Sequence, residues 1–532
     1  MTSYFEGKDK FGCAFANSDE SVFFPHIRKS CEGFPFFAEV EKKSYCVLHC
    51  PVEDKGEDFN KALKQKIDNK DFNFCGFWFP DEIDFHGFTF DASVDCYKAY
   101  FNKAASFNYT TFSESADFRA VVFKKYCGFI GVKFKERVIF KDTSFFQDAY
   151  FTSSQYDKEA IFITTYFQKS SFFNDTHFAE KADFYNSQFL KRADFSRAVF
   201  VDSASFDRTH FFDECDFRYS VFGSYAYLRD STFDLKVDFK FIEIHKDFEL
   251  NFSTFKDSIV FSGIEFSMIR LSSIFSENAR IIFESANIKF PKKAMFHSVT
   301  LCPSWFVNID PREFIFTNVI WEKADGNNKN VLSEIEDLKD RRVSNPYRLL
   351  IIACNQLSVN AEENNRYEEA SGFRRMVLET QRLERKEKQK IWLANFGHTF
   401  KREINLSNFF SYSGTAIKNS WSLIKTFPSD VLHFLYRIFS GYGERWFRAF
   451  CWLIAIWLIW AILYATPICD FIEKEKYSFS YWIGYSLNVI TLQRPEPKPA
   501  NAFTMIILGL EVLFAPLQAA LLILAVRRKF MR

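Results

Sequence analysis

The segment ADFYNSQFLKRADFSRAVF, residues 182–200, contains the pattern that decides the fold, because phenylalanine recurs in it at alternating steps of five and six residues. The pattern extends in both directions as two interleaved series, in each of which an aromatic or aliphatic residue returns every eleven positions. The first series is Phe118, Phe129, Phe140, Phe151, Phe162, Phe173, Phe184, Phe195, Phe206, Phe217, Leu228, Phe239, Leu250 and Phe261. The second series is Phe123, Phe134, Phe145, Tyr156, Phe167, Phe178, Phe189, Phe200, Phe211, Phe222, Phe233, Ile244, Phe255 and Phe266. A rhythm of this length is typical of a solenoid, in which each repeat packs only on its neighbours.

Small residues accompany the large ones two positions earlier, such as Ala182 before Phe184. In extended backbone these two positions face the same way, so we expect a large and a small side chain to point inward together. Four sides of this kind make a coil of about 22 residues, and the coils stack with a rise of about 4.8 Å. The phase extends back to Phe74 and forward to Ile288, with failures at Ser272 and Glu277. This predicts a rod of about ten coils.

Three motifs carry a family resemblance: Ala182-Asp183-Phe184, residues 193–200, and Cys215-Asp216-Phe217. They resemble the repeats of pentapeptide-repeat proteins, in the Phe-centred variety with an eleven-residue double unit. The resemblance implies a right-handed quadrilateral β-helix that serves as a scaffold or interaction surface, and it names no catalytic residue. Some family members resemble DNA and inhibit topoisomerases, but those rods are strongly acidic. Here 68 Lys and Arg balance 67 Asp and Glu, which argues against both DNA mimicry and nucleic-acid binding.

The amino-terminal segment lies outside the repeat and contains four cysteines, Cys13, Cys31, Cys46 and Cys50, with His49 beside the last. Four thiolates, or three with His49 as the alternative ligand, could hold a tetrahedral structural zinc ion. The other interpretation is a small cap that uses cysteine as a compact hydrophobe and covers the open edge of the first coil. We expect a helix near residues 57–70 to close this end. The first residues lack an apolar core and a cleavage motif, so we expect no signal peptide and reduced thiols facing the cytosol.

After the rod the period becomes helical, and two helices, one starting at Asn345-Pro346 and one at Tyr367, resemble a single tetratricopeptide-like hairpin. Residues 396–446 combine an excess of basic residues with aromatic ones, which is typical of a segment lying on an anionic lipid surface.

Two apolar stretches, residues 447–463 and 503–526, are long enough to span a bilayer. Basic residues flank them on their outer sides: Arg445, Arg448, Arg527, Arg528, Lys529 and Arg532. The positive-inside rule therefore places both termini in the cytoplasm and the connection outside. We expect a two-span protein of the cytoplasmic (inner) membrane of a bacterium.

The connection contains residues 480–492, which are too short to span a bilayer but apolar enough to enter its interface or to re-enter the membrane. The order of helix, short helix and helix resembles the two-span pore domain of tetrameric cation channels. However, QRPEPKP (residues 493–499) stands where filter glycines would be, so potassium selectivity is not expected. In the second span Thr504, Glu511 and Gln518 recur every seven residues and share one face. They form either a helix–helix seam, within the hairpin or between subunits of a homo-oligomer, or a polar pore lining.

We expect seven regions along the chain. They are a Cys-containing cap (1–70), the β-helix (71–300), its final edge strands (301–330), a helical hairpin (331–395), a basic juxtamembrane amphipathic region (396–446), the two-span hairpin with its pore-loop-like connection (447–526) and a basic tail (527–532). The expected fold class is thus a mainly β solenoid with an α-helical hairpin and two transmembrane helices.

The sequence contains no Gly-rich phosphate loop, no HExxH motif and no recognisable nucleophile motif, so we expect a protein that is not an enzyme. The first hypothesis is a membrane-anchored, cytoplasm-facing scaffold whose β-helix surface binds protein partners. The alternative is an oligomeric ion-conducting or membrane-depolarising pore with a cytoplasmic sensor rod, acting in stress or defence. Topoisomerase inhibition is the least favoured hypothesis.

Overall fold

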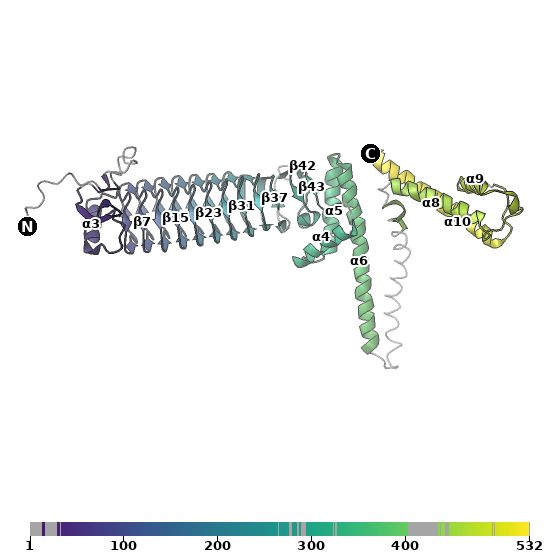
Figure 1. The fold of residues 1–532 in the computed structure, drawn as a ribbon, viewed down its shortest axis with the longest axis horizontal. Coiled ribbons are helices and arrows are strands. Elements are labelled where there is room, and N and C mark those ends of the chain that lie inside the picture. The colour runs from purple at the N-terminus through teal and green to yellow at the C-terminus, as the bar shows by residue number, and fades with distance from the viewer. Residues whose placement is uncertain are drawn as a thin grey trace, which may run out of the picture. The chain divides into compact units, whose positions relative to one another are not determined.

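The computed structural model describes residues 13–15, 29–31, 33–263, 265–275, 279–284, 287–288, 294–322, 324, 327–402, 435–436, 438–441, 446–491, 493 and 495–530. The chain divides into two compact units, Met1–Lys323 and Ala324–Arg532. The first unit is a β-solenoid with a capped amino-terminal end, and the second unit is helical (Figure 1).

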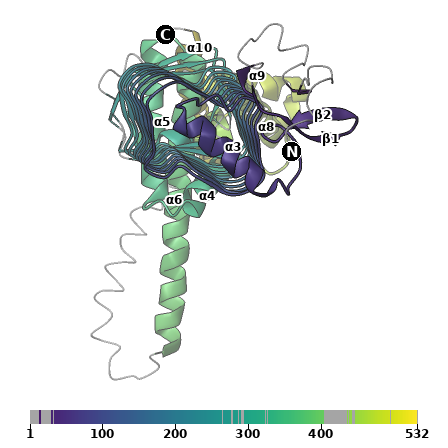
Figure 2. The same ribbon diagram turned by 90° about the vertical axis from the view of Figure 1, so that its left-hand side faces the viewer.

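Each coil of the solenoid has four short strands that pair in parallel with the strands of the next coil. The register repeats every 22 residues over most of the rod, as in the pairing of Val122 with Ser144 and of Cys127 with Ala149. One side of the coil is a ten-stranded sheet, the next side along the chain is a second ten-stranded sheet, and a 19-stranded sheet contains the strands of the other two sides. Viewed along the rod, the coils superimpose as one ring (Figure 2). The predicted four-sided coil of about ten turns is confirmed.

The strands of the first ten-stranded sheet are β3 (Trp78–Phe79), β7 (Tyr100–Phe101), β11 (Val122–Phe123), β15 (Ser144–Phe145), β19 (Tyr166–Phe167), β23 (Gln188–Phe189), β27 (His210–Phe211), β31 (Thr232–Phe233), β34 (Thr254–Phe255) and β37 (Ile274–Phe275). Those of the second are β4 (Ile83–Asp84), β8 (Ala105–Ser106), β12 (Cys127–Gly128), β16 (Ala149–Tyr150), β20 (Ser171–Phe172), β24 (Ala193–Asp194), β28 (Cys215–Asp216), β32 (Val237–Asp238), β35 (Ser258–Ser262) and β38 (Arg280–Glu284).

The 19-stranded sheet has one row of strands β5 (Thr89–Phe90), β9 (Thr111–Phe112), β13 (Lys133–Phe134), β17 (Gln155–Tyr156), β21 (His177–Phe178), β25 (Val199–Phe200) and β29 (Val221–Phe222). Its other row is β6 (Val94–Asp95), β10 (Ala116–Asp117), β14 (Val138–Ile139), β18 (Ala160–Ile161), β22 (Ala182–Asp183), β26 (Ala204–Ser205) and β30 (Ala226–Tyr227). Longer or later strands complete it: β33 (Glu243–Glu249), β36 (Glu265–Leu271), β39 (Asn287–Ile288), β40 (Ala294–His297) and β42 (Ile315–Thr317).

The interior of the rod is a ladder of aromatic rings. Every residue of the first series from Phe118 to Phe261 has 0% exposed surface. Rings one coil apart stack nearly parallel, as Phe140 on Phe162 with centroids 4.9 Å apart, and rings of opposite sides meet edge to face, as Phe162 and Phe173 at 5.3 Å. Burial contributes about 1.5–3 kcal/mol for each phenylalanine, and each ring pair adds about 0.5–1.5 kcal/mol.

The small positions of the repeat also point inward, and many of those that are Thr or Ser are hydrogen-bonded there. The Thr165 hydroxyl donates to the Phe140 carbonyl at 2.9 Å, and the Thr209 hydroxyl donates to the Phe184 carbonyl at 2.8 Å. These bonds cross from one coil to the next. The buried hydroxyls are therefore hydrogen-bonded, and their bonds link neighbouring coils.

A corner in the left-handed backbone region returns every eleven residues, which the sequence pattern did not indicate. Arg197 has φ of 56°, and the turn around it is closed by a bond of 3.1 Å from the Ala198 N–H to the Phe195 carbonyl. The non-glycine residues at this position are Lys98, Tyr109, Ala120, Asp142, Ser153, Thr164, Asp175, Asn186, Arg197, Arg208, Tyr219, Asp230, Phe241 and Phe252. Glycine takes it at 76, 87, 131 and 263. Because few of these residues are glycine, the usual composition signal for such a turn is missing.

The eleven-residue pattern fails after residue 266 because the strand register shifts there, while the coils of the rod continue. Phe248 pairs with Ile269 and Phe255 with Phe275, which shortens this coil, and Phe261 pairs again with Phe283 at the usual distance in sequence. Leu271 is buried beside the half-exposed Ser272, while Glu277 lies outside the described residues. The stacking continues to β41 (Thr300–Leu301) and β43 (Ile320–Trp321), past the short helix η2 (Pro303–Phe306).

The amino-terminal end of the rod is closed by an antiparallel hairpin, β1 (Phe36–Val40) and β2 (Lys43–Cys46), and by α3 (Gly56–Asp68). Helix α3 lies across the opening of the first coil (Figure 2). Its buried Phe59 meets Phe79 edge to face at 5.6 Å. Helix α3 therefore covers the first ring of this column, which has Phe101 on its other side.

The helical unit begins with α4 (Asn328–Asp340), α5 (Pro346–Glu363) and α6 (Tyr367–Arg402). Helices α5 and α6 are antiparallel, because Tyr347 contacts Glu387 whereas Ser358 contacts the Ala370 carbonyl. Residues 403–434, 437 and 442–445, and with them most of the predicted basic amphipathic region, lie outside the described residues, as do the last two residues of the basic tail.

The chain then forms α8 (Trp446–Ala465), the short η3 (Lys474–Lys476), α9 (Phe479–Ile490) and α10 (Ala502–Phe530). Two helices, Trp446–Ala465 and Ala502–Arg527, are long and apolar enough to cross a membrane. The predicted pair of apolar helices is therefore confirmed, with the short helix α9 between them.

The Tyr156→Phe substitution should stabilise the rod. Tyr156 is fully buried in the ladder, stacked on Phe178 at 4.6 Å, and its hydroxyl has no hydrogen-bond partner among the described residues. Removing an unsatisfied buried hydroxyl is expected to raise the free energy of unfolding by about 1–3 kcal/mol. Denaturant titration of the full-length protein in detergent measures this, with Phe178→Tyr as the matched variant that should destabilise. Equal effects of the two substitutions would contradict the prediction.

Candidate functional sites in the cap and in the apolar hairpin

The cap brings together four of the five ligands that the sequence suggested. The donor atoms of Cys13, Cys31, Cys46 and His49 all lie within 4.8 Å of one another, and all four side chains are buried. His49 Nδ1 lies 3.4 Å from Cys13 Sγ and 3.2 Å from Cys46 Sγ. Three thiols and one imidazole nitrogen form a donor set that could hold zinc in tetrahedral geometry.

Cys50, which belonged to the four-cysteine set, is not a member of this cluster, and His49 takes its place. The N–H groups of His49 and Cys50 both bond to the Cys46 carbonyl, so residues 46–50 form one tight turn. In this turn the His49 ring extends to the Cys46 sulfur, while the Cys50 side chain is buried apart from the other thiols. Adjacent residues cannot both direct their side chains to one point in such a turn, and the longer imidazole is the one that reaches the cluster.

The four members come from separate short segments. Cys13 is held by a bond of 2.8 Å from the Ala14 N–H to the Ser44 carbonyl, and Cys31 lies in the turn before β1. Cys46 is the last residue of β2. His49 follows in the turn that rests on the first coil, where the Trp78 N–H donates to the Leu48 carbonyl at 2.9 Å.

The other nitrogen of His49 is engaged by the rod. Nε2 lies 2.8 Å from the Cys75 carbonyl oxygen and 3.2 Å from the Ser30 hydroxyl. Since a carbonyl only accepts, Nε2 carries a proton, and Nδ1 is the ring nitrogen that faces the thiols. The ring is also held by stacking on Phe15 at 4.7 Å and by the edge of Phe77 at 5.5 Å. A metal-binding histidine is usually oriented in this way by a partner of its second nitrogen.

The electrostatic surroundings favour a thiolate in the cluster. Hydrogen bonds from Cys31 and Cys46 lower the pKa of Cys13 from its usual value. Lys55 is buried next to this region, and its ammonium donates to the Leu48 carbonyl at 3.3 Å and to the Trp78 carbonyl at 2.6 Å. Burial lowers the pKa of Lys55 to about 7, and the nearby Cys50 and Cys46 oppose that shift because their thiolates favour the charged ammonium.

The three polar residues of the second apolar helix lie on its buried face. Thr504, Glu511 and Gln518 have 0%, 0% and 1% exposed surface. The Glu511 carboxylate accepts hydrogen bonds from the Tyr464 hydroxyl of α8 and the Ser486 hydroxyl of α9. These contacts join all three helices of the hairpin at one point.

The other two polar residues of this face are also paired within the chain. The Thr504 hydroxyl accepts from the Asp470 N–H at 2.9 Å. The Gln518 amide donates to the Ala449 carbonyl at 2.8 Å and to the Phe439 carbonyl at 3.3 Å. This arrangement corresponds to a seam within the hairpin, which is one of the two alternatives left open by the sequence. Satisfying the polar groups in this way removes most of their cost in an apolar environment.

Helix α9 enters the hairpin from its connecting end and reaches the middle of α8. The Trp457 indole donates to the Ile483 carbonyl at 2.9 Å, and the Ser486 hydroxyl donates to the Trp457 carbonyl at 3.1 Å. The chain then returns alongside α9, where the Tyr485 hydroxyl donates to the Pro497 carbonyl at 3.0 Å. A short helix followed by a returning segment matches the re-entrant alternative that the apolar composition of residues 480–492 left open.

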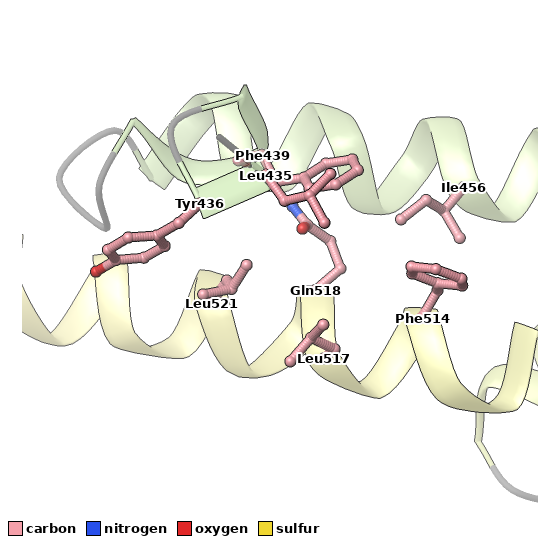
Figure 3. Close-up of a pocket in the computed structure, with 8 residues that line it drawn as sticks. All are labelled: Leu435, Tyr436, Phe439, Ile456, Phe514, Leu517, Gln518 and Leu521. Carbon is pink, nitrogen blue, oxygen red and sulfur yellow. Dashed lines mark hydrogen bonds between the residues drawn. The ribbon is translucent and has the colours of Figure 1, made fainter. Parts of the chain in front are cut away.

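A pocket of about 250 Å³ lies near the opposite end of the hairpin (Figure 3). Its lining residues are Leu435, Tyr436, Phe439, Ile456, Phe514, Leu517, Gln518 and Leu521. Apart from the Gln518 amide and the Tyr436 hydroxyl this lining is hydrocarbon, so the pocket offers no group suited to acid–base or nucleophilic chemistry.

Comparison with known proteins supports the fold. The family model described as Pentapeptide repeats (9 copies) matches residues 173–221. Together with the four-sided β-solenoid, this match shows that the rod contains pentapeptide repeats, and it supports the resemblance inferred from the sequence. No curated protein and no solved structure gave a significant match.

Glu511→Leu should destabilise the hairpin, whereas Glu511→Gln should be close to neutral. Leucine leaves the hydroxyls of Tyr464 and Ser486 buried without an acceptor, at about 1–3 kcal/mol for each group, and glutamine keeps an acceptor oxygen. Thermal unfolding of the full-length protein in detergent should show a lower Tm for Glu511→Leu. Adding Ser486→Ala to Glu511→Leu should recover part of the loss. A Glu511→Leu variant as stable as the parent protein would show that the seam does not hold the helices.

Proposed function

We propose that this protein is a non-catalytic scaffold, anchored in a membrane by α8 and α10, whose β-solenoid surface binds protein partners. The observation that carries the proposal is the combination of a rod filled with aromatic rings and two apolar helices whose outer faces are exposed. A filled rod leaves its outward side chains as the surface available for recognition, and such solenoids present extended binding surfaces.

The charge on the rod supports protein partners over nucleic acid. Acidic and basic side chains of neighbouring coils pair with each other, as Arg197 with Asp175 and Lys158 with Glu180. The surface therefore alternates in sign along the rod. A DNA mimic requires a continuous acidic surface and a nucleic-acid binder a basic one, so this pattern opposes both.

The exposed faces of the two apolar helices support insertion in a bilayer. Leu513 and Ile523 of α10 have 70% and 69% exposed surface, which would be costly in water and suits lipid chains. Helices α8 and α10 are antiparallel, since Trp460 bonds to Ile507 and Gln518 to Ala449. Arg448 and Arg527 are then at the same end, and the positive-inside rule supports a cytoplasmic location for both termini at the inner membrane.

Removing residues 446–532 should release the protein from membranes. In cell fractionation we expect the full chain in the membrane pellet and the truncated chain in the supernatant. A matched pair of point variants refines the test: Leu513→Arg places a charge on the lipid face, costing about 2.5–3.5 kcal/mol on the insertion scale, and should weaken insertion. Tyr219→Arg, on an exposed corner of the rod, should not. A truncated chain that still sediments with membranes would exclude the proposed anchor.

An oligomeric pore is the second candidate function, and the re-entrant α9 is the observation that favours it. Four or more copies around an axis would place α9 and the returning segment of each chain near that axis, as in the two-span channels that the hairpin resembles. Thr491 and Gln493 are exposed at the tip of this segment. In this candidate function they would face the conduction path, whereas Glu511 would remain in the seam.

The pore candidate predicts conductance in planar bilayers containing the purified full-length protein. Thr491→Lys should reduce cation conductance severalfold, because it adds a positive charge at the proposed constriction. Ile472→Lys, at an exposed position in the connection between α8 and α9, serves as the matched control for added charge. Inserted oligomers that conduct no ions would leave the scaffold as the function, and a monomer in detergent would favour the scaffold as well.

The cap belongs to the scaffold proposal as the closed end of the rod. At this end, the buried cluster of three cysteines and His49 offers the ligands for a structural zinc ion and has no catalytic role in this proposal.

A further inference from the structure

We infer that the cap binds one Zn²⁺ through the thiolates of Cys13, Cys31 and Cys46 and through Nδ1 of His49, and that this ion fastens the amino-terminal segment onto the first coil of the rod. The inference extends the proposed scaffold, because a scaffold rod needs a closed end. Its argument uses only the cap, and its test does not depend on membrane insertion or on partner binding.

The donor set selects zinc among the common metals. Three cysteines and one histidine, buried and within 4.8 Å of one another, match a closed structural zinc site. Magnesium and calcium require oxygen ligands, of which the cluster has none, and a four-iron cluster uses four thiolates. All four ligand positions are filled by protein, so the ion has no open position for substrate or water, which defines a structural and not a catalytic centre.

The second nitrogen of His49 shows that the site is oriented by the rod itself. The bond of 2.8 Å between Nε2 and the Cys75 carbonyl fixes the imidazole so that Nδ1 is the coordinating atom. Cys75 lies in the first coil, directly before the left-handed Gly76. The ring of Phe15 lies so close to Gly76 that a Cβ there would be 2.1 Å from a ring carbon, so the amino-terminal segment rests directly on the coil.

Charge around the cluster is consistent with a metal thiolate centre. Zn²⁺ with three thiolates and a neutral imidazole carries one net negative charge. The Lys55 ammonium is buried between the Leu48 and Trp78 carbonyls and above the rings of Phe59 and Trp78, at 4.7 and 5.4 Å. A buried lysine in this position compensates the negative charge of the centre and holds α3 to the turn that carries His49.

The ion would join segments that otherwise have few contacts. Residues 13–15 and 29–31 precede the repeat, and among the described residues two backbone bonds join them to the rest of the cap: from the Ala14 N–H to the Ser44 carbonyl and from the Phe34 N–H to the Cys31 carbonyl. The ligands Cys46 and His49, by contrast, belong to the turn stacked on the first coil. Zinc binding therefore supplies folding free energy to an end of the chain that lacks the aromatic ladder, and it protects the first open strand edge from pairing with another chain.

The experiment measures metal content and spectroscopy on the full-length protein purified in detergent without added metal. We expect about one zinc per chain by elemental analysis. Cobalt exchanged into the site should show the visible bands of tetrahedral Co²⁺ together with thiolate charge-transfer absorption. Cys46→Ser and His49→Gln should each lose the zinc, and Cys50→Ser, a neighbouring buried cysteine outside the cluster, should retain it.

A second measurement covers the case in which the ligand variants fail to fold. Chelation of the parent protein should loosen the β1–β2 hairpin and allow trypsin to cleave after Lys42 and Lys43, while the rod stays resistant, and added Zn²⁺ should restore protection. Ser30→Ala, which removes a partner of His49 Nε2, should weaken zinc affinity by about 10-fold. A parent protein without zinc, a disulfide between the cluster cysteines in place of the metal, or zinc retained in both ligand variants would overturn the inference. A protein that binds zinc and does not sediment with membranes would refute the anchor alone.

Discussion

The stacking of aromatic rings along the axis of the coil is the interaction on which the rest of this structure depends. Rings one coil apart stack on each other, and many rings also meet rings of other sides edge to face, as Phe173 meets Phe184. The spacing of parallel strands, about 4.8 Å, is close to the spacing that offset or stacked rings prefer, so backbone hydrogen bonding and side-chain packing favour the same rise. Centroid distances such as 4.9 Å between Phe184 and Phe206 show that both are met together.

Much of the fold could be predicted because the buried aromatic residues recur at a fixed interval in the sequence. Residues that recur every eleven positions over so many coils can all be buried only if each repeat makes the same turn. The two interleaved series therefore predicted both the four sides and the length of a coil. The apolar spans were predictable for a similar reason, since length and composition alone distinguish them. Two features of the rod were not predictable. The register shift near Phe255 depends on how two neighbouring strands align. The left-handed corners are occupied by residues without a common type, such as Arg197, Tyr219 and Phe241.

The candidate site in the cap was only partly predictable. The cysteines and His49 stand out in the sequence, but the choice between His49 and Cys50 depends on the direction of two adjacent side chains in one turn. The role of Cys75 is carried by its backbone carbonyl, which has no sequence signal. In the hairpin, the spacing of Thr504, Glu511 and Gln518 predicted a shared face. The partners of Glu511, which are Tyr464 and Ser486, could not be predicted, because they depend on how α9 packs against the two longer helices.

The left-handed corners have a consequence for how such a rod can diversify. A non-glycine residue in this conformation costs about 1 kcal/mol, and here the cost is accepted at position after position by side chains of every chemical kind. The corner is thus determined by the framework and not by the residue that occupies it. Two rows of outward positions, one on each of the two opposite corners, are free to change from charged to aromatic to small while the framework stays the same. Binding preference could therefore drift rapidly between related chains without any loss of the shared shape.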